Sequence, residues 1–437
     1  MNAIPVRLLA EADAVTAAEV LRTLTFRAGF NTSLVVAGSM LLGLAAGLVG
    51  AFALLRKRSL MADALSHATL PGLCAAFLVA SSLGISGKSA LVLLIGAGVS
   101  GVATVLVVQW LARHPRVRED AAIGAGLSVS FGLGVVLLSA VPSVSSAPAA
   151  GLSRFIFGQT AAMLPADAAL MAGIALVSAA AVVLLHKELA LVSFNEGFAE
   201  VSGWPVKALD TLLLALVVLV TVAGIQAVGI ILVVSMFIIP AVSARFWTDR
   251  LGRMVALSGA FGAASGYLGA AASALLPRAP AGSVIVLVAG GVFVLSMLAS
   301  PRRGVAAGVW RRAALRLRIA TDHLVESMIE ADGEGTAATT ESLRRARGWG
   351  QARVRAALLA ALIRGLVEPA AEGWRLTPRG SAGGARVARN HRLWTRYLTT
   401  HADVAPSHVD WSVDQVEHVL PDEVVRELEA QDRGADA

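Results

Sequence analysis

The sequence predicts an all-α polytopic membrane protein with about eight or nine transmembrane helices, followed by a cytoplasmic winged-helix-like domain. The chain of 437 residues is 56% hydrophobic and only 15% charged, whereas soluble globular proteins carry about 25% charged residues. Long apolar runs fill residues 33–300. After Pro301 these runs stop and amphipathic helical periodicity begins, as in 310–331 and 384–400.

Residues 1–32 form an N-terminal segment of mixed character. Arg7, Arg22 and Arg27 lie among apolar residues. The order of basic start, apolar middle and small-residue cleavage site is missing, so we do not predict a cleaved signal peptide. A short amphipathic or loosely ordered segment is the expectation.

Nine segments between residues 33 and 300 are long and apolar enough to cross about 30 Å of hydrocarbon as helices. They cover residues 33–55, 60–82, 88–111, 121–142, 165–186, 206–224, 226–247, 252–276 and 281–300. Because 206–247 is almost one unbroken apolar run, the sequence also allows a total of eight or ten.

Basic residues gather in the loops that follow the odd-numbered spans. Arg56, Lys57 and Arg58 follow the first span, and Arg302 and Arg303 follow the ninth. Since cytoplasmic loops are enriched in Lys and Arg, the N-terminus is predicted outside and the C-terminus in the cytoplasm. The net charge of +7 therefore reflects membrane topology first, and not affinity for nucleic acid.

Small residues recur at close to four-residue spacing within two of the spans. Gly43, Gly47 and Gly50 lie in the first span, and Gly262 and Gly266 lie in the eighth. Such spacing predicts helices that approach one another closely. Pro71 and Pro240 lie inside other spans, where each predicts either a break in the helix or a kink.

The second predicted span contains an acid and an imidazole. Asp63 and His67 are four residues apart, so on a helix they share one face. A carboxylate and an imidazole at that spacing can bind one divalent cation together. Ionisable groups within a bilayer are costly and mark functional sites. The single cysteine, Cys74, excludes an intrachain disulfide and any metal site built from several thiolates.

Two motifs that suggest an enzyme fail on their context. Gly87-Lys88-Ser89 resembles the end of a phosphate-binding loop, but no strand precedes it and Ser82 stands at the position of the loop's first glycine. No Ser–His–Asp pattern has supporting context. We therefore predict no nucleotide binding at Gly87–Ser89, and a hydrolase has weak support from the sequence.

Residues 190–205 form a polar stretch between two spans on the predicted cytoplasmic side. Helix-forming residues are followed by Gly203 and Pro205, which are stop signals. We expect a short helix at the membrane surface.

Residues 301–320 are predicted to form a linker and residues 321–437 a cytoplasmic domain. Helices at 341–347 and 350–365 join at Gly348, and a hairpin follows over 366–377, which is the order of a winged helix. Several arginines of these helices could contact DNA phosphates or anionic lipid. The sequence favours anionic lipid over DNA, because the Ala- and Leu-rich second helix offers few groups that read bases.

Metal-ligating residue types gather near the C-terminus. Asp414, Glu417 and His418 share one helical face, and His391 precedes them. Carboxylates with imidazoles suit manganese, iron or zinc better than copper(I). The alternative interpretation is a polar surface that happens to contain histidines.

The stretch between Leu54 and Phe77, with LRKRSLMADALSHATLPGL, resembles the permease subunits of ABC importers for manganese, zinc and iron. SFNEGFAEVSGWP and GIILVVSMFIIPAVSARFWTDRL are similar to two further blocks of that family, and the resemblance covers about residues 25–300. It implies that Asp63 and His67 coordinate the transported ion. It also implies an ATPase-coupling turn whose matching residues are Phe194, Asn195, Glu196, Ala199 and Gly203.

The resemblance further implies that the chain is not itself an enzyme, because it would have no ATPase of its own, and that it works with a set of partners. A dimer of cytoplasmic ABC ATPases would hydrolyse ATP, an extracellular or periplasmic metal-binding protein would deliver the ion, and a second permease chain, identical or different, would complete the pathway. No cofactor would be bound permanently; Mn²⁺, Fe²⁺ or Zn²⁺ would be the transported substrate. The location implied is the bacterial plasma (inner) membrane.

The C-terminal part resembles iron- and manganese-dependent repressors of the diphtheria-toxin-repressor type. NHRLWTRYL carries His391, VDQVEHVLPDEVVREL carries Asp414, Glu417 and His418, and TDHLVES carries Asp322, all at matching ligand positions. Val325 and Thr395 stand where that type has two further acids. The resemblance implies a regulatory metal site with feedback on transport.

We therefore predict the membrane permease of an ATP-driven importer of manganese, iron or zinc. The first alternative is a membrane-tethered, metal-responsive DNA-binding regulator, although nine spans exceed what an anchor needs. The second alternative is a proton- or sodium-coupled carrier that works without an ATPase.

Overall fold

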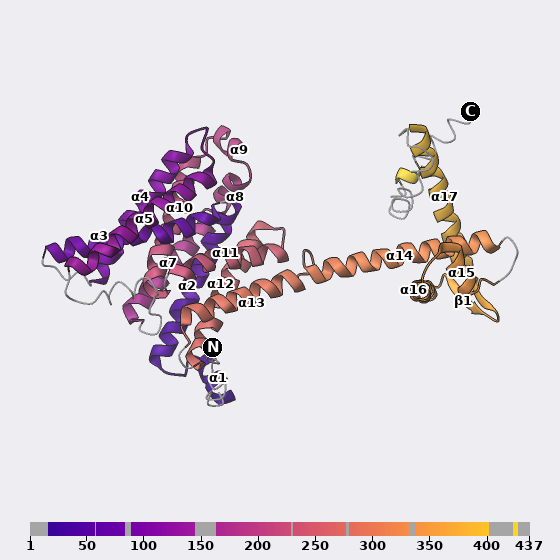
Figure 1. Ribbon diagram of the computed structural model, residues 1–437, viewed down its shortest axis with the longest axis horizontal. Coiled ribbons are helices and arrows are strands. Elements are labelled where there is room, and N and C mark those ends of the chain that lie inside the picture. The colour runs from indigo at the N-terminus through magenta and orange to yellow at the C-terminus, as the bar shows by residue number, and fades with distance from the viewer. Residues whose placement is uncertain are drawn as a thin grey trace, which may run out of the picture. The chain divides into compact units, whose positions relative to one another are not determined.

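The computed structural model describes residues 16–56, 58–83, 89–144, 163–228, 230–276, 279–332, 337–401 and 423–426. The chain divides into two compact units, Met1–Ala307 and Gly308–Ala437. The first is a bundle of helices, and the second combines helices with a small hairpin (Figure 1). Each unit is described by itself.

The first unit is built from apolar helices that follow one another along the chain. Its described helices are α1 (Ala17–Leu24), α2 (Phe30–Leu55), α3 (Ser59–Ser82), α4 (Ala90–Ala112), α5 (Glu119–Val144), α7 (Pro165–Leu184), α8 (His186–Phe194), α9 (Glu196–Val201), α10 (Val206–Val228), α11 (Ile230–Trp247), α12 (Leu251–Leu275) and α13 (Ala281–Ala299). Among the described residues, eight helices have the length and hydropathy of membrane spans, and Leu232–Trp247 of α11 is a shorter apolar helix. The predicted multi-pass helical membrane fold is confirmed.

Helix α1 accounts for part of the N-terminal segment. Thr16 and Glu19 form a capping box, in which the Thr16 hydroxyl accepts from the Glu19 amide and the Glu19 carboxylate accepts from the Thr16 amide. The helix exposes most of its side chains, but Thr23 is buried. The expectation of a short amphipathic segment therefore fits residues 17–24.

Helices α2 and α12 pack with their backbones in close contact. A Cβ atom added to Gly43 would collide with the backbone oxygen of Gly262, and one added to Gly266 would collide with that of Ser39. The Ser258 hydroxyl donates a 2.6 Å hydrogen bond to the backbone oxygen of Gly47. The close approach predicted from the small-residue spacing is what the structure has.

This packing predicts that Gly43→Ala lowers thermal stability. The added methyl has no room, and overpacking a tight core costs about 1–3 kcal/mol, which outweighs the gain of up to about 1 kcal/mol from replacing a helical glycine. Gly290→Ala in α13 is the matched control, because a Cβ there meets nothing within 4 Å. Melting temperatures of the two purified variants under one scan rate test this. Equal or higher stability of Gly43→Ala would contradict it.

Neither of the two prolines inside spans ends its helix. Pro71 lies within α3 and Pro240 lies within α11, and both helices continue beyond them. Next to Pro71, Gly72 packs directly against Gly96 of α4, so the neighbouring helix supports this turn. Of the two outcomes the sequence allowed, a broken helix is thus excluded at both positions.

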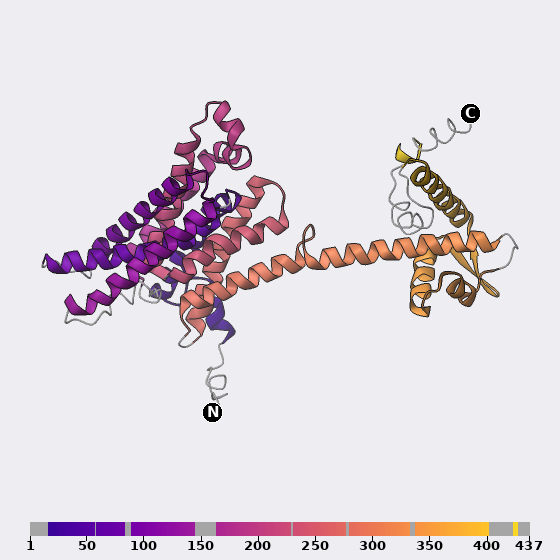
Figure 2. The ribbon, with the colours of Figure 1, turned by 45° about the horizontal axis from the view of Figure 1, so that its top comes forward.

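The second unit is organised around a long helix. α14 (Val305–Asp332) leads into α15 (Thr340–Arg347), α16 (Gln351–Ile363), β1 (Val367–Ala370), β2 (Gly373–Leu376) and α17 (Pro378–His401). Within this unit, α15, α16 and the hairpin lie on one side of α14, and most of α17 lies on the other (Figures 1 and 2). Most of the range 301–320, predicted as a linker, is the first part of α14.

The helix–turn–helix and the hairpin have the predicted order and turn chemistry. Gly348 joins α15 to α16 with a φ of 63°, a left-handed conformation that favours glycine. The strands pair antiparallel, with Val367 opposite Leu376. The core of the unit contains Val325 and Leu358. The winged-helix-like fold is confirmed.

Candidate functional site

Asp63 and His67 are the two residues of their helix segment that reach the surface. From Met61 to Cys74 every residue of α3 is buried except these two. The Asp63 side chain is 36% exposed and that of His67 is 33% exposed. The burial pattern therefore places an acid and an imidazole together on one accessible strip of an otherwise enclosed membrane helix.

The two side chains are near each other without forming a tight pair. Nε2 of His67 lies 3.6 Å from Oδ1 of Asp63, which is longer than a normal hydrogen bond. The His67 ring meets Phe131 of α5 edge-on, with centroids 5.2 Å apart, and this contact restricts the ring. Both polar groups are thus positioned side by side and remain available to a ligand.

The described residues supply two ligands here and not a complete coordination sphere. No group of three or more His, Cys, Asp or Glu residues that could hold a metal occurs in the described part of the chain. Zinc usually takes four ligands, and manganese prefers oxygen-rich octahedral sites. A cation at Asp63 and His67 would need further ligands from water or from another chain.

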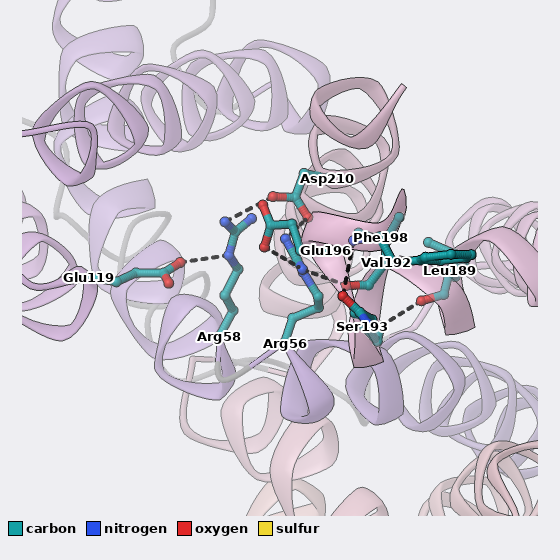
Figure 3. A network of polar contacts seen from close by, with 10 residues as sticks. Arg56, Arg58, Glu119, Leu189, Val192, Ser193, Glu196, Phe198 and Asp210 are labelled. Atoms are coloured by element: carbon teal, nitrogen blue, oxygen red, sulfur yellow. Dashed lines mark hydrogen bonds and ion pairs between the residues drawn. The ribbon is translucent and has the colours of Figure 1, made fainter. Parts of the chain in front are cut away.

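A buried ion-pair cluster lies where α3 begins. Arg58, the residue before α3, donates from Nε to Glu119 at 2.6 Å and pairs through Nη2 with Asp210 at 3.0 Å. Arg56, at the end of α2, pairs with the other oxygen of Asp210 at 2.7 Å and with Glu196 at 3.0 Å. Figure 3 shows Asp210 between the two guanidinium groups. The cluster thus ties together the ends of α2, α3, α5, α9 and α10.

The arginines and Asp210 are the enclosed members of this cluster. The side chains of Arg56, Arg58 and Asp210 are 8%, 15% and 14% exposed. Burial alone would lower the pKa of Arg56, but the charges of Asp210 and Glu196 outweigh burial and raise it. Arg56 therefore stays charged, and it depends on these carboxylates for compensation.

A short exposed segment projects from the same cluster. Arg56 donates a 2.8 Å hydrogen bond to the backbone oxygen of Val192 in α8. The Asn195 side chain accepts from the Phe198 amide at 3.0 Å and so caps α9. The structure thus has the short helix expected within 190–205.

This segment presents apolar side chains outward on a fixed backbone. Phe194, Phe198 and Val201 are 70%, 58% and 90% exposed, whereas Ala199 is fully buried. Gly203 has a φ of 79°, and the next residue, Trp204, donates its amide to the backbone oxygen of Ala199. Exposed aromatic and aliphatic groups on a short capped helix are suited to docking against another protein.

The sequence profile of the ABC 3 transport family matches residues 31–300. The chain belongs to this family. It is 36% identical over 377 residues to the manganese transport system membrane protein MntC of Bacillus subtilis, covering 86% of each protein. It is 42% identical over 283 residues to the zinc transport system membrane protein TroC of Treponema pallidum, covering 65% of this chain and 93% of that one.

A solved structure agrees with the family assignment. The structure of PsaBC from Streptococcus pneumoniae in complex with Fab matches with a TM-score of 0.55 and 31% identity, covering 66% of this chain and 98% of that chain. A second profile, the iron dependent repressor metal binding and dimerisation domain, matches residues 377–431. The sequence prediction of an ABC permease with a repressor-like C-terminal part is confirmed.

Most of the predicted C-terminal metal ligands of this ABC-family chain have no described side chain. Asp414, Glu417 and His418 lie outside the described residues, and His391 lies in α17 without a described side chain. Asp322 of α14 is the one whose side chain is described, and its Oδ1 lies 3.6 Å from Nη1 of Arg364. The described residues therefore do not by themselves form a metal site there.

Asp210 and Glu119 belong to the ion-pair cluster of Arg56 and Arg58, and neither was predicted from the sequence. In the sequence, Arg56 and Arg58 indicate membrane topology only. Asp210 is the one acid in the apolar run 206–224. That isolated charge was a signal for a buried partner, because an acid within an apolar helix needs a compensating cation.

Proposed function

We propose that this chain is the membrane permease of an ATP-driven importer of divalent transition metal ions, namely manganese, zinc or iron. The observation that carries the proposal is the accessible pair of Asp63 and His67 on the otherwise buried stretch of α3. Relatives are named for manganese and for zinc transport. Both metals accept carboxylate and imidazole ligands.

The pair would replace part of the hydration shell of the ion within the membrane. A hydrated dication cannot cross hydrocarbon, and conduction needs binding strong enough for entry and weak enough for release. Two ligands from one chain meet the second requirement. A second permease chain that faced the first through α3 would add its own pair, and movement of the two chains apart would release the ion.

The partners follow from the ABC family and from the exposed segment. The α8–α9 segment, with Phe194, Asn195, Glu196, Ala199 and Gly203, would dock on a separate ATPase dimer that hydrolyses ATP. Its link to α3 would run through Arg56, Asp210 and Arg58. An extracellular or periplasmic metal-binding protein would deliver the ion to the opposite side of the bacterial plasma membrane.

The positive loops predict a cytoplasmic position for the α8–α9 segment and for the C-terminal unit. Metal sensing by that unit is a separate prediction. It depends on His391, Asp414, Glu417 and His418, in addition to Asp322. The transport steps proposed above do not use it.

Reconstitution in liposomes tests the proposed function. The chain with its ATPase and binding protein should take up Mn²⁺ or Zn²⁺ only when ATP is present, and competition among Mn²⁺, Zn²⁺ and Fe²⁺ should rank the substrates. The same assay with residues 321–437 deleted should still show uptake, which a tethered regulator would not predict. Uptake by the chain alone, driven by a proton or sodium gradient, would contradict the proposal and favour a carrier.

A further inference from the structure

The C-terminal unit contains a cavity that the proposed transport function does not use. It has a volume of about 620 Å³ and lies between α14, the end of α16 and the first turns of α17. Its charged lining consists of Arg318, Asp322, Arg364, Arg379 and Arg386. The volume falls within the range of about 300–1,000 Å³ that is usual for small-molecule sites.

The described lining is strongly cationic. Four guanidinium groups surround the cavity against a single carboxylate. Arg364 pairs with that carboxylate, on Asp322, at 3.6 Å. In the part of the chain that the structure describes, Arg318, Arg379 and Arg386 have no ion-pair partner, and their side chains are exposed. Three arginines are thus free to contact a ligand that enters the cavity.

The direction of α17 adds to the positive potential. The helix begins at Pro378, and Arg379, Gly383 and Arg386 in its first turns line the cavity. The N-terminal end of a helix carries a partial positive charge. The Gly380 amide already donates to the Thr377 hydroxyl at 3.0 Å. The helix therefore favours an anion mainly through its partial positive charge, and less through free amide donors.

We propose that this cavity binds a small polyanion of the phosphate class. Guanidinium groups match the oxygens of phosphate in geometry and can donate two parallel hydrogen bonds each. Three or four of them around one cavity suit a ligand with more than one negative charge. Such a site differs from the cation site expected here by resemblance, because it would bind an anion through Arg318, Arg379 and Arg386, whereas the expected cation site would use Asp322.

Binding of pyrophosphate to the full-length chain tests the proposal. The protein is placed in phosphatidylcholine nanodiscs without free divalent metal, and affinity is measured by calorimetry. The double variant Arg318→Gln/Arg379→Gln should weaken binding at least tenfold. The matched control Arg355→Gln/Arg375→Gln removes two exposed arginines of the same unit that lie outside the cavity lining and should bind like the parent chain. All four substitutions are at exposed positions, so melting temperatures should stay alike.

The other outcomes are equally decisive. Absence of binding by the parent chain, or equal weakening in both double variants, overturns the proposal. So does binding of Mn²⁺ to the parent chain that Asp322→Asn abolishes while pyrophosphate fails to bind. Nanodiscs that contain phosphatidylglycerol distinguish two possible occupants with the same phosphate chemistry, a lipid headgroup and a soluble compound. Competition by that lipid identifies a headgroup as the occupant, and no competition identifies a soluble phosphate compound; either result keeps the site.

Discussion

Asp63→Ala and His67→Ala should each reduce ATP-driven metal uptake by about 100-fold or more while the protein still folds and assembles. Each substitution removes one of two ligands. Loss even of the outer partners of a metal site lowers affinity or activity by about 10–100-fold, so loss of a direct ligand should do at least as much. Uptake of radioactive Mn²⁺ or Zn²⁺ into liposomes that contain the complete complex measures the effect.

Controls separate this effect from a general loss of structure. His114→Ala and Asp120→Ala remove the same residue types at exposed positions just outside α4 and at the start of α5, and both should transport normally. Asp63 and His67 are partly exposed, so their truncation should leave the melting temperature within a few degrees of the parent. Normal uptake by either Asp63→Ala or His67→Ala would show that the ion crosses elsewhere.

Hydropathy predicted the membrane helices well, because the bilayer requires every span to be apolar. Lipid offers no hydrogen-bond partners, so each crossing segment must be a long apolar helix. The glycines at 43, 47, 262 and 266 likewise predicted close packing, since few other residues permit it. Pro71 was ambiguous on sequence because its effect depends on the neighbouring helix. Packing of Gly72 against Gly96 supports that turn, and the sequence does not show which helix lies beside it.

Only part of the candidate site could be predicted from the sequence. Asp63 and His67 are neighbours on one helix, so local periodicity predicts their alignment. Asp210 lies far along the chain from Arg56, and its position between Arg56 and Arg58 follows from tertiary packing alone. The positive charge of the C-terminal cavity could not be predicted from the sequence either, because it also depends on tertiary packing. Its arginines come from α14, α16 and α17, and each appears in the sequence as an ordinary surface residue.

Asp210→Asn should destabilise the chain strongly, and the comparison with Asp249→Asn makes the reason clear. Each aspartate pairs with two arginines, Asp210 with Arg56 and Arg58, and Asp249 with Arg302 and Arg303. The side chain of Asp210 is 14% exposed and that of Asp249 is 49% exposed. Removing one partner of a buried pair costs about 3–5 kcal/mol, whereas exposed pairs contribute about 0–1 kcal/mol.

The arginines left behind by Asp210→Asn cannot lose their charge, because a guanidinium stays protonated in proteins. Glu196 and Glu119 remain as their partners, but these carboxylates are 53% and 40% exposed and compensate less. We therefore expect a clear drop in melting temperature for Asp210→Asn, little change for Asp249→Asn, and lower uptake per ATP hydrolysed in the Asp210 variant alone. The last effect follows because the α8–α9 segment and the start of α3 would lose their shared anchor. Equal melting temperatures and equal uptake in the two variants would mean that the cluster neither stabilises the permease nor transmits movement to Asp63 and His67.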